Sequence, residues 1–241
     1  MLCAFFILFG YQETIRQKIF SFSGHLQVST YSMDRSMEEK SLSLNLPLYK
    51  NPEAFAQVSH VMAYSHKGAL VKRDGDVYGV LLKGVDSRWG SLDHSDYLTQ
   101  GTAKLHEANV TPEGVLISES FAKKVNASLG DTLTFYFVQH PPRARRCPVV
   151  GLFDTGMEEY DQRLVVADLQ MVRDLNQWED TLAGGLEVRL NDYSLIDTAK
   201  VRLQSALPSD LLVEDVRQKY FFIFDWLELL NNNVRIFLIF I

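Results

Sequence analysis

Residues 114–167 read GVLISESFAKKVNASLGDTLTFYFVQHPPRARRCPVVGLFDTGMEEYDQRLVVA, and this stretch decides the fold. Its first part predicts a strand at 114–117 that runs directly into a short helix at 118–126. Ser118 is the predicted N-cap, because its hydroxyl can accept a hydrogen bond from an unpaired amide of the first turn. Phe121 and Val125 share one face of this helix at i, i+4 spacing. The stretch therefore begins with a compact strand–helix unit.

The second part of the stretch predicts a β-hairpin. Gly130 and Asp131 are a turn signal, and residues 132–138 alternate between apolar and polar side chains, which is typical of a strand. A proline- and arginine-rich loop at 139–148 separates this strand from a second, apolar strand at 149–153. The stretch contains no nucleophile motif, no phosphate-binding loop and no metal-ligand spacing. It predicts a small α/β unit with a basic hairpin tip.

Short motifs in this stretch resemble one protein family in their order and spacing. They are SESFA at 118–122, GD at 130–131, VVGLF at 149–153 and TG followed by EYD between 155 and 161. Together they resemble the LolC/LolE branch of the FtsX/MacB-type ABC transporter permeases. Those proteins carry a large extracytoplasmic domain between their first and second transmembrane helices. The resemblance extends over nearly the whole chain.

Length and composition exclude several classes of function. The chain of 241 residues can hold one domain or two modest ones, and its hydrophobic content of 46% is normal for a globular core. Its net charge of -6 argues against nucleic acid as a partner, because phosphate binding needs concentrated lysine and arginine. Two cysteines give no disulfide framework.

The two ends of the sequence are strongly apolar. Residues 1–9 read MLCAFFILF and residues 234–241 read VRIFLIFI, and both runs are shorter than the ~20 residues that span a bilayer. Residues 10–22 continue the first run with helical spacing, as expected where a helix leaves a membrane. We interpret the chain as a loop domain cut inside one transmembrane helix at each end. Buried core segments, or a signal peptide at the N-terminus, are the alternative interpretations.

Strands and helices interleave along the rest of the chain, with hairpins among them. Asp74-Gly75 predicts a hairpin turn, and Asn51-Pro52-Glu53 predicts the start of a helix at 52–58. Further helices are expected at 168–178 and 194–206, with Val201 in the packed face of the latter. Further strands are expected at 25–30, 60–67, 69–72, 77–83, 164–167, 186–190 and 211–216. This pattern predicts an α+β fold with mixed sheets.

The resemblance implies how this fold is divided. In the family, a Porter subdomain is built from the two segments nearest the membrane helices, and a Sabre subdomain is inserted between them. We expect residues 1–24 to be the end of the first transmembrane helix with an interface helix. Residues 25–100 and 192–219 would form Porter, and residues 101–191 would form Sabre. Residues 220–241 would lead into and begin the second transmembrane helix. The expected whole is a MacB-like periplasmic core domain between two partial transmembrane helices.

No group of residues in the sequence predicts an enzyme. The motifs of serine hydrolases, zinc peptidases, thiol oxidoreductases and nucleotide-binding loops are missing. Residues 93–96 (DHSD) hold metal-type ligands, but residues this close in a loop rarely converge on one ion. Glu158, Glu159 and Asp161 lie on one loop and are not held at a defined separation across a substrate. We predict no catalytic residue, no metal site and no cofactor.

The loop at 139–148, QHPPRARRCP, is the best candidate for a partner contact. Its prolines stiffen it through their fixed φ angles, and its arginines supply planar donors for carboxylates or lipid phosphates. The candidate residues are Pro141, Pro142, Arg143, Arg145 and Arg146. In LolC-type permeases a longer hairpin in the equivalent region catches a periplasmic lipoprotein carrier, and LolE-type members lack that hook. A basic tip without a specific partner is the alternative.

The resemblance implies a role in transport. The chain would be the periplasmic domain of an inner-membrane permease that releases lipoproteins and couples ATP-driven helix movement to cargo transfer. The implied partners are a cytoplasmic ABC ATPase subunit, a second permease copy or paralogue, lipoprotein cargo with a periplasmic carrier, and membrane lipid. Two alternatives stay open. One is an efflux-type or FtsX-like signalling domain that regulates a cell-wall hydrolase, and the other is an unrelated secreted binding domain.

Overall fold

The computed structural model describes residues 2–31, 39–105 and 114–225 of the chain. Its strands are β1 (Leu26–Thr30), β2 (Leu42–Ser43), β3 (Val58–Arg73), β4 (Asp76–Val85), β5 (Leu98–Gly101), β6 (Val115–Ser118), β7 (Thr132–Phe137), β8 (Arg143–Phe153), β9 (Leu164–Asp168), β10 (Leu182–Ala183), β11 (Gly185–Leu190) and β12 (Leu211–Asp215). Its helices are α1 (Leu2–Ser23), α2 (Pro47–Lys50), α3 (Ser87–Gly90), α4 (Glu119–Lys124), α5 (Glu158–Asp161), α6 (Leu169–Asn176), α7 (Ile196–Ala206) and α8 (Val216–Lys219).

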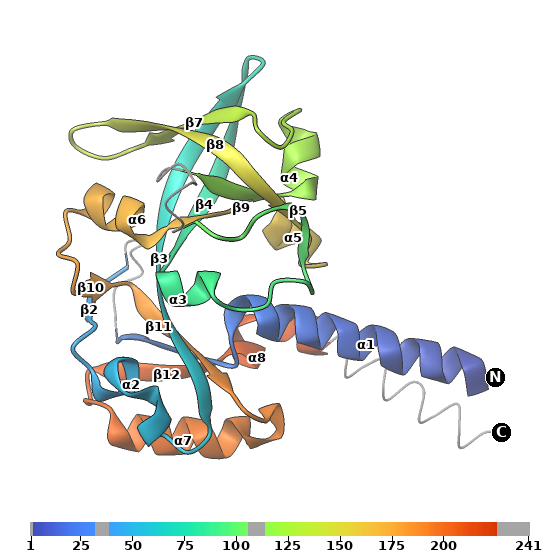
Figure 1. The fold of residues 1–241 in the computed structure, drawn as a ribbon, viewed down its shortest axis with the longest axis vertical. Coiled ribbons are helices and arrows are strands. Elements are labelled where there is room, and N and C mark those ends of the chain that lie inside the picture. The colour runs from blue at the N-terminus through green and yellow to red at the C-terminus, as the bar shows by residue number, and fades with distance from the viewer. Residues whose placement is uncertain (1, 32–38, 106–113, 226–241) are drawn as a thin grey trace.

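One large mixed sheet organises the molecule (Figure 1). In the described residues it has ten strands, which follow the order β12-β1-β11-β3-β4-β9-β6-β8-β5, and β7 pairs with both β3 and β8. The β4–β9 and β6–β8 pairs are parallel and the other pairs are antiparallel. A small second sheet joins β2 to β10. This confirms the predicted α+β fold with mixed sheets.

The β3–β4 hairpin runs through both halves of the molecule. Its strands pair from Tyr64 opposite Val85 to Arg73 opposite Asp76. The turn is the predicted pair Asp74-Gly75, with φ angles of 53° and 94°, which suit the twist of a two-residue hairpin turn. The two strands predicted at 60–67 and 69–72 are in fact parts of the single strand β3. Gly68 between them does not interrupt the strand, because β4 pairs with β3 on both sides of it.

Each half of the sheet has its own hydrophobic core. In the lower half of Figure 1, α7 packs on β12, β1, β11 and the first part of β3. The side chains that meet there include Leu26, Val28, Leu186, Val188, Leu203 and Val213. In the upper half, α4 and α6 pack on the far part of the hairpin and on β6 to β9. The side chains that meet there include Val71, Leu82, Phe121, Phe135, Val165 and Val172.

Two helix predictions differ from the structure. Val201 on α7 was expected in the packed face, but it is 67% exposed, and Ile196, Ala199 and Leu203 are buried instead. The helix predicted at 52–58 is wrong. Pro52–Ala54 form a single 3₁₀ turn, and Val58 already belongs to β3. Pairing of β3 with β11 outweighs the helix-start signal of the residues just before it.

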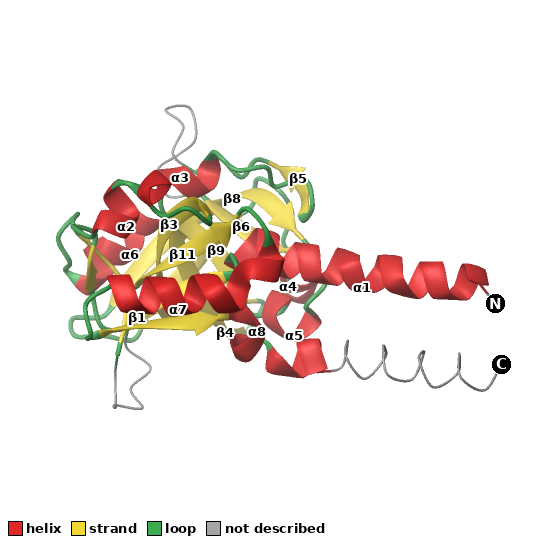
Figure 2. Cartoon of the chain, turned by 90° about the horizontal axis from the view of Figure 1, so that it is seen from below, coloured by secondary structure: helices red, strands yellow, loops and turns green. Residues whose placement is uncertain are grey.

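Helix α1 extends away from the body of the molecule (Figure 2). Its last turns enter the fold, where Ile19, Phe20 and Phe22 are buried. The helix ends as expected at Gly24, whose φ of 70° is left-handed and whose α-carbon approaches the backbone of Val188. Within the described ranges, no helix is both long enough and apolar enough to cross a bilayer. The predicted lead-in to a second membrane helix lies mostly outside the described residues, at 226–241.

Candidate functional site

The strand–helix unit that begins the central stretch forms as predicted. The Ser118 hydroxyl accepts a hydrogen bond from the Phe121 amide at 3.0 Å and so caps α4. Residues of β7 alternate between exposed and buried, with Leu133, Phe135 and Phe137 in the core. The unit therefore provides a rigid base for the hairpin that follows it.

The candidate contact residues lie on a hairpin and not on one long loop. β8 already begins at Arg143 and pairs with β7 from Phe137 opposite Arg143 to Thr132 opposite Pro148. The connection between the strands is limited to residues 138–142. The predicted loop at 139–148 is therefore wrong for most of its length. The backbone of its arginines continues the sheet, so the basic composition of this segment did not make it a loop.

The structure separates the candidate residues into two groups. Pro141, Pro142 and Arg146 are exposed, whereas Arg143 and Arg145 are partly buried. The Arg143 guanidinium donates to the Asp174 carbonyl at 2.7 Å, which fastens the tip to the end of α6. Arg143 is thus a tether of the tip, and the exposed tip consists of the two prolines together with Val138, which is 84% exposed.

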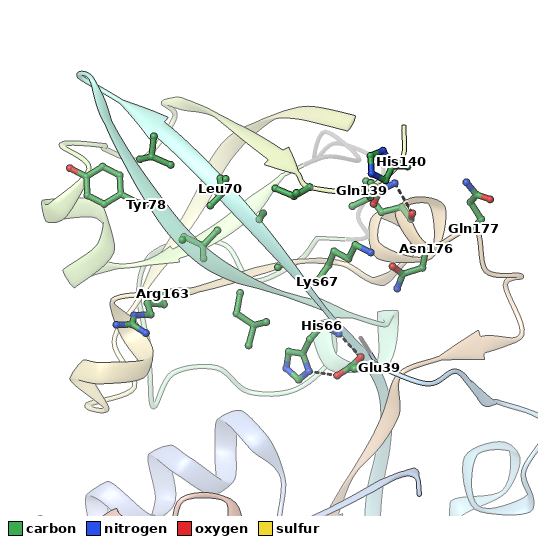
Figure 3. Close-up of a pocket in the computed structure, with 18 of the residues that line it drawn as sticks. Glu39, His66, Lys67, Leu70, Tyr78, Gln139, His140, Arg163, Asn176 and Gln177 are labelled. Atoms are coloured by element: carbon green, nitrogen blue, oxygen red, sulfur yellow. Dashed lines mark hydrogen bonds and ion pairs between the residues drawn. The ribbon is translucent and has the colours of Figure 1, made fainter. Parts of the chain in front are cut away.

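A groove of about 1130 Å³ lies between this tip, the β3–β4 hairpin and the end of α6 (Figure 3). Several apolar side chains on its walls are exposed, with Leu70 at 36%, Val77 at 60% and Leu81 at 42%. Basic side chains from separate elements also line it, namely Lys67, Lys124, His140 and Arg163. The groove therefore combines an apolar floor with a positive rim.

Glu39 closes one end of the groove. Its carboxylate lies 2.5 Å from Nδ1 of His66 and accepts the His66 backbone N–H at 2.7 Å (Figure 3). A Cβ on Gly184 would lie 1.9 Å from the same carboxylate, so a larger residue there would displace the Glu39 side chain from this position. The carboxylate thus takes the position in which a neighbouring strand would place a carbonyl oxygen against β3.

A second polar cluster is buried where α1 meets the sheet, and we call it the junction. Lys83 on β4 and Glu187 on β11 form an ion pair of 2.7 Å, with side chains only 3% and 2% exposed. Lys83 also donates to the Phe22 carbonyl of α1 at 3.0 Å. Gln27 donates to Glu187 at 3.2 Å and accepts from Lys219 at 2.8 Å. Burial lowers the pKa of Lys83, and Glu187 partly offsets that effect.

The junction joins both ends of the described chain to the central strands. Ser23, the last residue of α1, shares a 2.9 Å hydrogen bond with the hydroxyl of Tyr220, just after α8. Lys219 reaches Gln27 on β1 from the same segment. Sequence analysis missed this cluster. Its available signal was a single charged residue in each of two apolar strand segments, Lys83 in LLKGV and Glu187 in GLEV.

Asp161 and His94, two of the residues singled out in the sequence, have structural roles. Asp161 accepts two hydrogen bonds from Thr155, at 2.6 and 3.1 Å, and its burial raises its pKa to about 6. His94 is buried against Trp89, and its Nδ1 lies 2.5 Å from the Tyr97 hydroxyl. Burial lowers the pKa of His94 to about 4. In the described part of the chain, no three potential ligands come together around a metal position.

Comparison with known proteins identifies the family. The model of the MacB-like periplasmic core domain matches residues 2–206. The periplasmic region of MacB from Actinobacillus actinomycetemcomitans is similar in structure, with 16% identity and a TM-score of 0.54, over 87% of this chain and 97% of that one. The extracellular domain of the ABC-type transporter YknZ from Gram-positive bacteria has 13% identity and a TM-score of 0.49, over 79% and 99%. A domain of a putative permease from Porphyromonas gingivalis has 18% identity and a TM-score of 0.43, over 80% and 89%.

No curated protein sequence matches the chain. At these identities the likeness to MacB shows the fold alone, and the family follows from the match over residues 2–206. Domains of this family lie in the periplasm as parts of dimeric membrane transporters that work with an ABC ATPase subunit, and they are not enzymes. The chain belongs to the family of MacB-like periplasmic core domains, and it is the periplasmic domain of a MacB/FtsX-type ABC permease.

Proposed function

We propose that this domain belongs to a permease that releases lipoproteins from the inner membrane, and that it passes movement of the membrane helices to the cargo. The motif order between residues 118 and 161, which is similar to that of the LolC/LolE branch, supports the choice of branch. The junction is the single observation that carries the coupling role. It ties α1 to β4 through Lys83 and ties α8 to β1 through Gln27, and both Lys83 and Gln27 contact Glu187 of β11.

The junction lies at the base of a continuous path to the tip. Lys83 holds the last residues of α1 through the Phe22 carbonyl, and it is part of β4. β4 pairs with β3 along its whole length, and β3 pairs with β7, which ends at the tip. Because packed, hydrogen-bonded elements move as rigid bodies, a displacement of α1 at the junction shifts the far end of the hairpin and the tip together.

The division into two subdomains is part of the same proposal. The two hydrophobic cores of the sheet support a membrane-proximal part and an inserted part. β11 pairs with β1 and β3 and packs in the membrane-proximal core, although it falls within the expected range 101–191. We therefore place the end of the inserted part before Gly185, and we retain residues 192–219 in the membrane-proximal part.

The five candidate contact residues are proposed to meet a periplasmic partner through the exposed part of the tip. A photo-crosslinking amino acid at Pro142 in the full-length parent protein tests this in cells. We expect an adduct with a periplasmic lipoprotein carrier, and none from a probe at Val201, which is exposed on α7 at the other end of the fold. An adduct with a cell-wall hydrolase or an outer-membrane efflux component would refute lipoprotein release and favour signalling or efflux.

A further inference from the structure

The edge of β3 is open between two neighbouring strands. β11 pairs with β3 over residues 58–64, and β7 pairs with it at residues 70–71. Among the described residues, the segment 65–69 has a paired strand, β4, on one side only. The other side faces the groove, whose lining includes residues 66–69 (Figure 3). The sheet therefore has a short gap that opens into the groove.

The backbone of Gly68 points into this gap. In a strand, the N–H and C=O groups of successive residues point to opposite edges. The His66 N–H points to the groove side, where it donates to Glu39, and Gly68 shares that direction. Leu81, which lies opposite Gly68 on β4, instead donates to the Arg163 carbonyl on its far side. Gly68, which lines the groove, thus presents a donor and an acceptor to it, and the position of a Cβ on Gly68 is also open.

The charges around the gap are positive in a chain whose net charge is -6. Lys67, Lys124 and Arg163 line the groove, and no carboxylate of the described residues forms an ion pair with them. Glu39, the acidic residue of the lining, is already paired with His66. A positive cleft on a negative protein attracts an acidic ligand and rejects a basic one.

Gln139 adds a specific polar group to the same lining. Its Nε2 donates to the Leu175 carbonyl at 3.2 Å, which fixes the direction of the amide. Its Oε1 is buried and has no hydrogen-bond partner among the described residues. A buried acceptor without a partner is costly. The fixed amide of Gln139 thus gives the tip side of the groove a polar side chain, while β3 supplies backbone hydrogen-bonding groups.

We propose that the groove binds an extended acidic segment of a partner polypeptide, which adds a short strand to the open edge of β3. Main-chain hydrogen bonds to Gly68 supply affinity, and alternate side chains supply specificity. The guest residue opposite Gly68 places its side chain on the face of Leu70 and Leu81, so it is apolar. Its two neighbours point to the face of Lys67, so they are acidic. This inference does not depend on lipoprotein release.

The first test uses the unaltered 241-residue chain and a dye-labelled eight-residue peptide of alternating glutamate and valine, followed by fluorescence anisotropy. A second peptide carries lysine in place of glutamate. A third keeps the acidic sequence but has N-methyl groups that remove alternate backbone donors. We expect the acidic peptide to bind, and each companion to bind at least about tenfold more weakly, which corresponds to ~1.4 kcal/mol. Binding should also weaken as salt is added.

Variants with matched controls locate the binding to the gap. Gly68→Pro removes the backbone N–H that points to the groove and no hydrogen bond to β4. Proline is tolerated at such a position, because the edge N–H that it removes points outward. Gly79→Pro is its control, since Gly79 lies on β4 and points to the opposite edge of the hairpin. Lys67→Glu reverses a charge that lines the groove. Lys72→Glu is its control, because it reverses a charge on the same strand but outside the groove. We expect about tenfold losses for Gly68→Pro and Lys67→Glu only.

Three results would overturn the proposal. The first is equal binding of the lysine and glutamate peptides. The second is unchanged binding of the acidic peptide by Gly68→Pro. The third is no peptide binding together with a dimer in sedimentation equilibrium that Gly68→Pro abolishes, because the edge of β3 would then pair with a second copy of the chain. The peptide comparison on the unaltered chain keeps the proposal testable whether or not the variants fold.

Discussion

Replacement of Lys83 by methionine removes the positive charge that forms a buried ion pair with Glu187. The charged atoms are 2.7 Å apart, and both side chains are almost fully shielded from solvent. At an effective dielectric constant of about 20, such a pair gains about 6 kcal/mol of Coulomb energy before desolvation is counted. Methionine has a similar length and keeps the packing of the lysine stem. The variant therefore tests the charge rather than the volume.

The net loss of stability is smaller than the Coulomb energy, because the variant no longer has a lysine charge that must be desolvated on folding. The Phe22 carbonyl also loses its donor from Lys83, which adds about 1 kcal/mol. We expect Lys83→Met to lower the free energy of unfolding by about 4 kcal/mol at pH 7. This agrees with the 3–5 kcal/mol typical of breaking one side of a buried pair.

Urea unfolding of the parent chain and of Lys83→Met at pH 7, followed by circular dichroism, measures the difference in stability. Replacement of the exposed Lys72 by methionine is the matched control and should change stability by less than about 0.5 kcal/mol.

A double variant separates the charge from the rest of the junction. In Lys83→Met with Glu187→Leu, no buried charge is left without a partner, so most of the lost stability should return. The double variant should nevertheless hold α1 less firmly, because the Phe22 carbonyl still lacks its donor. A loss below about 1 kcal/mol for Lys83→Met would refute the conclusion that Lys83 and Glu187 form a buried pair in which each charge needs the other.

Other predictions concern separate features of the fold. His94 is 6% exposed and its pKa is lowered to about 4, so the unfolded chain binds more protons between pH 4 and the ordinary value of 6.5. Stability should therefore fall by about 3 kcal/mol as pH drops through that window, and the fall should be smaller in His94→Gln; equal pH profiles would contradict this. Ser118→Ala leaves the Phe121 amide without its cap and should cost about 1 kcal/mol in urea unfolding, against no cost for Ser205→Ala on an exposed helix face. Gly84→Ala puts a Cβ 2.7 Å from Val172 and should lower the free energy of unfolding by about 1–3 kcal/mol. An unchanged midpoint of urea unfolding would show that α6 can shift to make room.

Signals confined to a few neighbouring residues were read correctly from the sequence. The Asp74-Gly75 turn, the Ser118 cap and the alternation of β7 all appear as predicted. Asp168 likewise caps α6 by accepting from the Gln170 amide at 2.7 Å. Each of these features depends on the backbone geometry of one turn or strand, and the residues that set that geometry are adjacent in the chain.

Features that need partners from distant parts of the chain were missed or misread. Arg143 to Arg146 look like a loop by composition, but β7 supplies a pairing strand and turns them into the start of β8. The short helix expected after Asn51 gives way because β11 pairs with Val58. In both cases the pairing of a strand outweighs a local preference that is worth well under a kilocalorie per residue.

The junction shows most clearly what the linear sequence could not reveal. Lys83 and Glu187 each appear as single charges in short apolar segments, LLKGV and GLEV, and neither position indicates the other. Only the folding of β4 and β11 onto β3 brings them to 2.7 Å and shields them from water. The same applies to the gap at Gly68. It exists because pairing with β11 stops at Tyr64 of β3, whereas pairing with β7 starts only at Leu70. Local sequence patterns indicated the elements and their family. Long-range strand pairing decided where the buried charges and the open edge lie, because burial energy depends on neighbours that only the folded chain supplies.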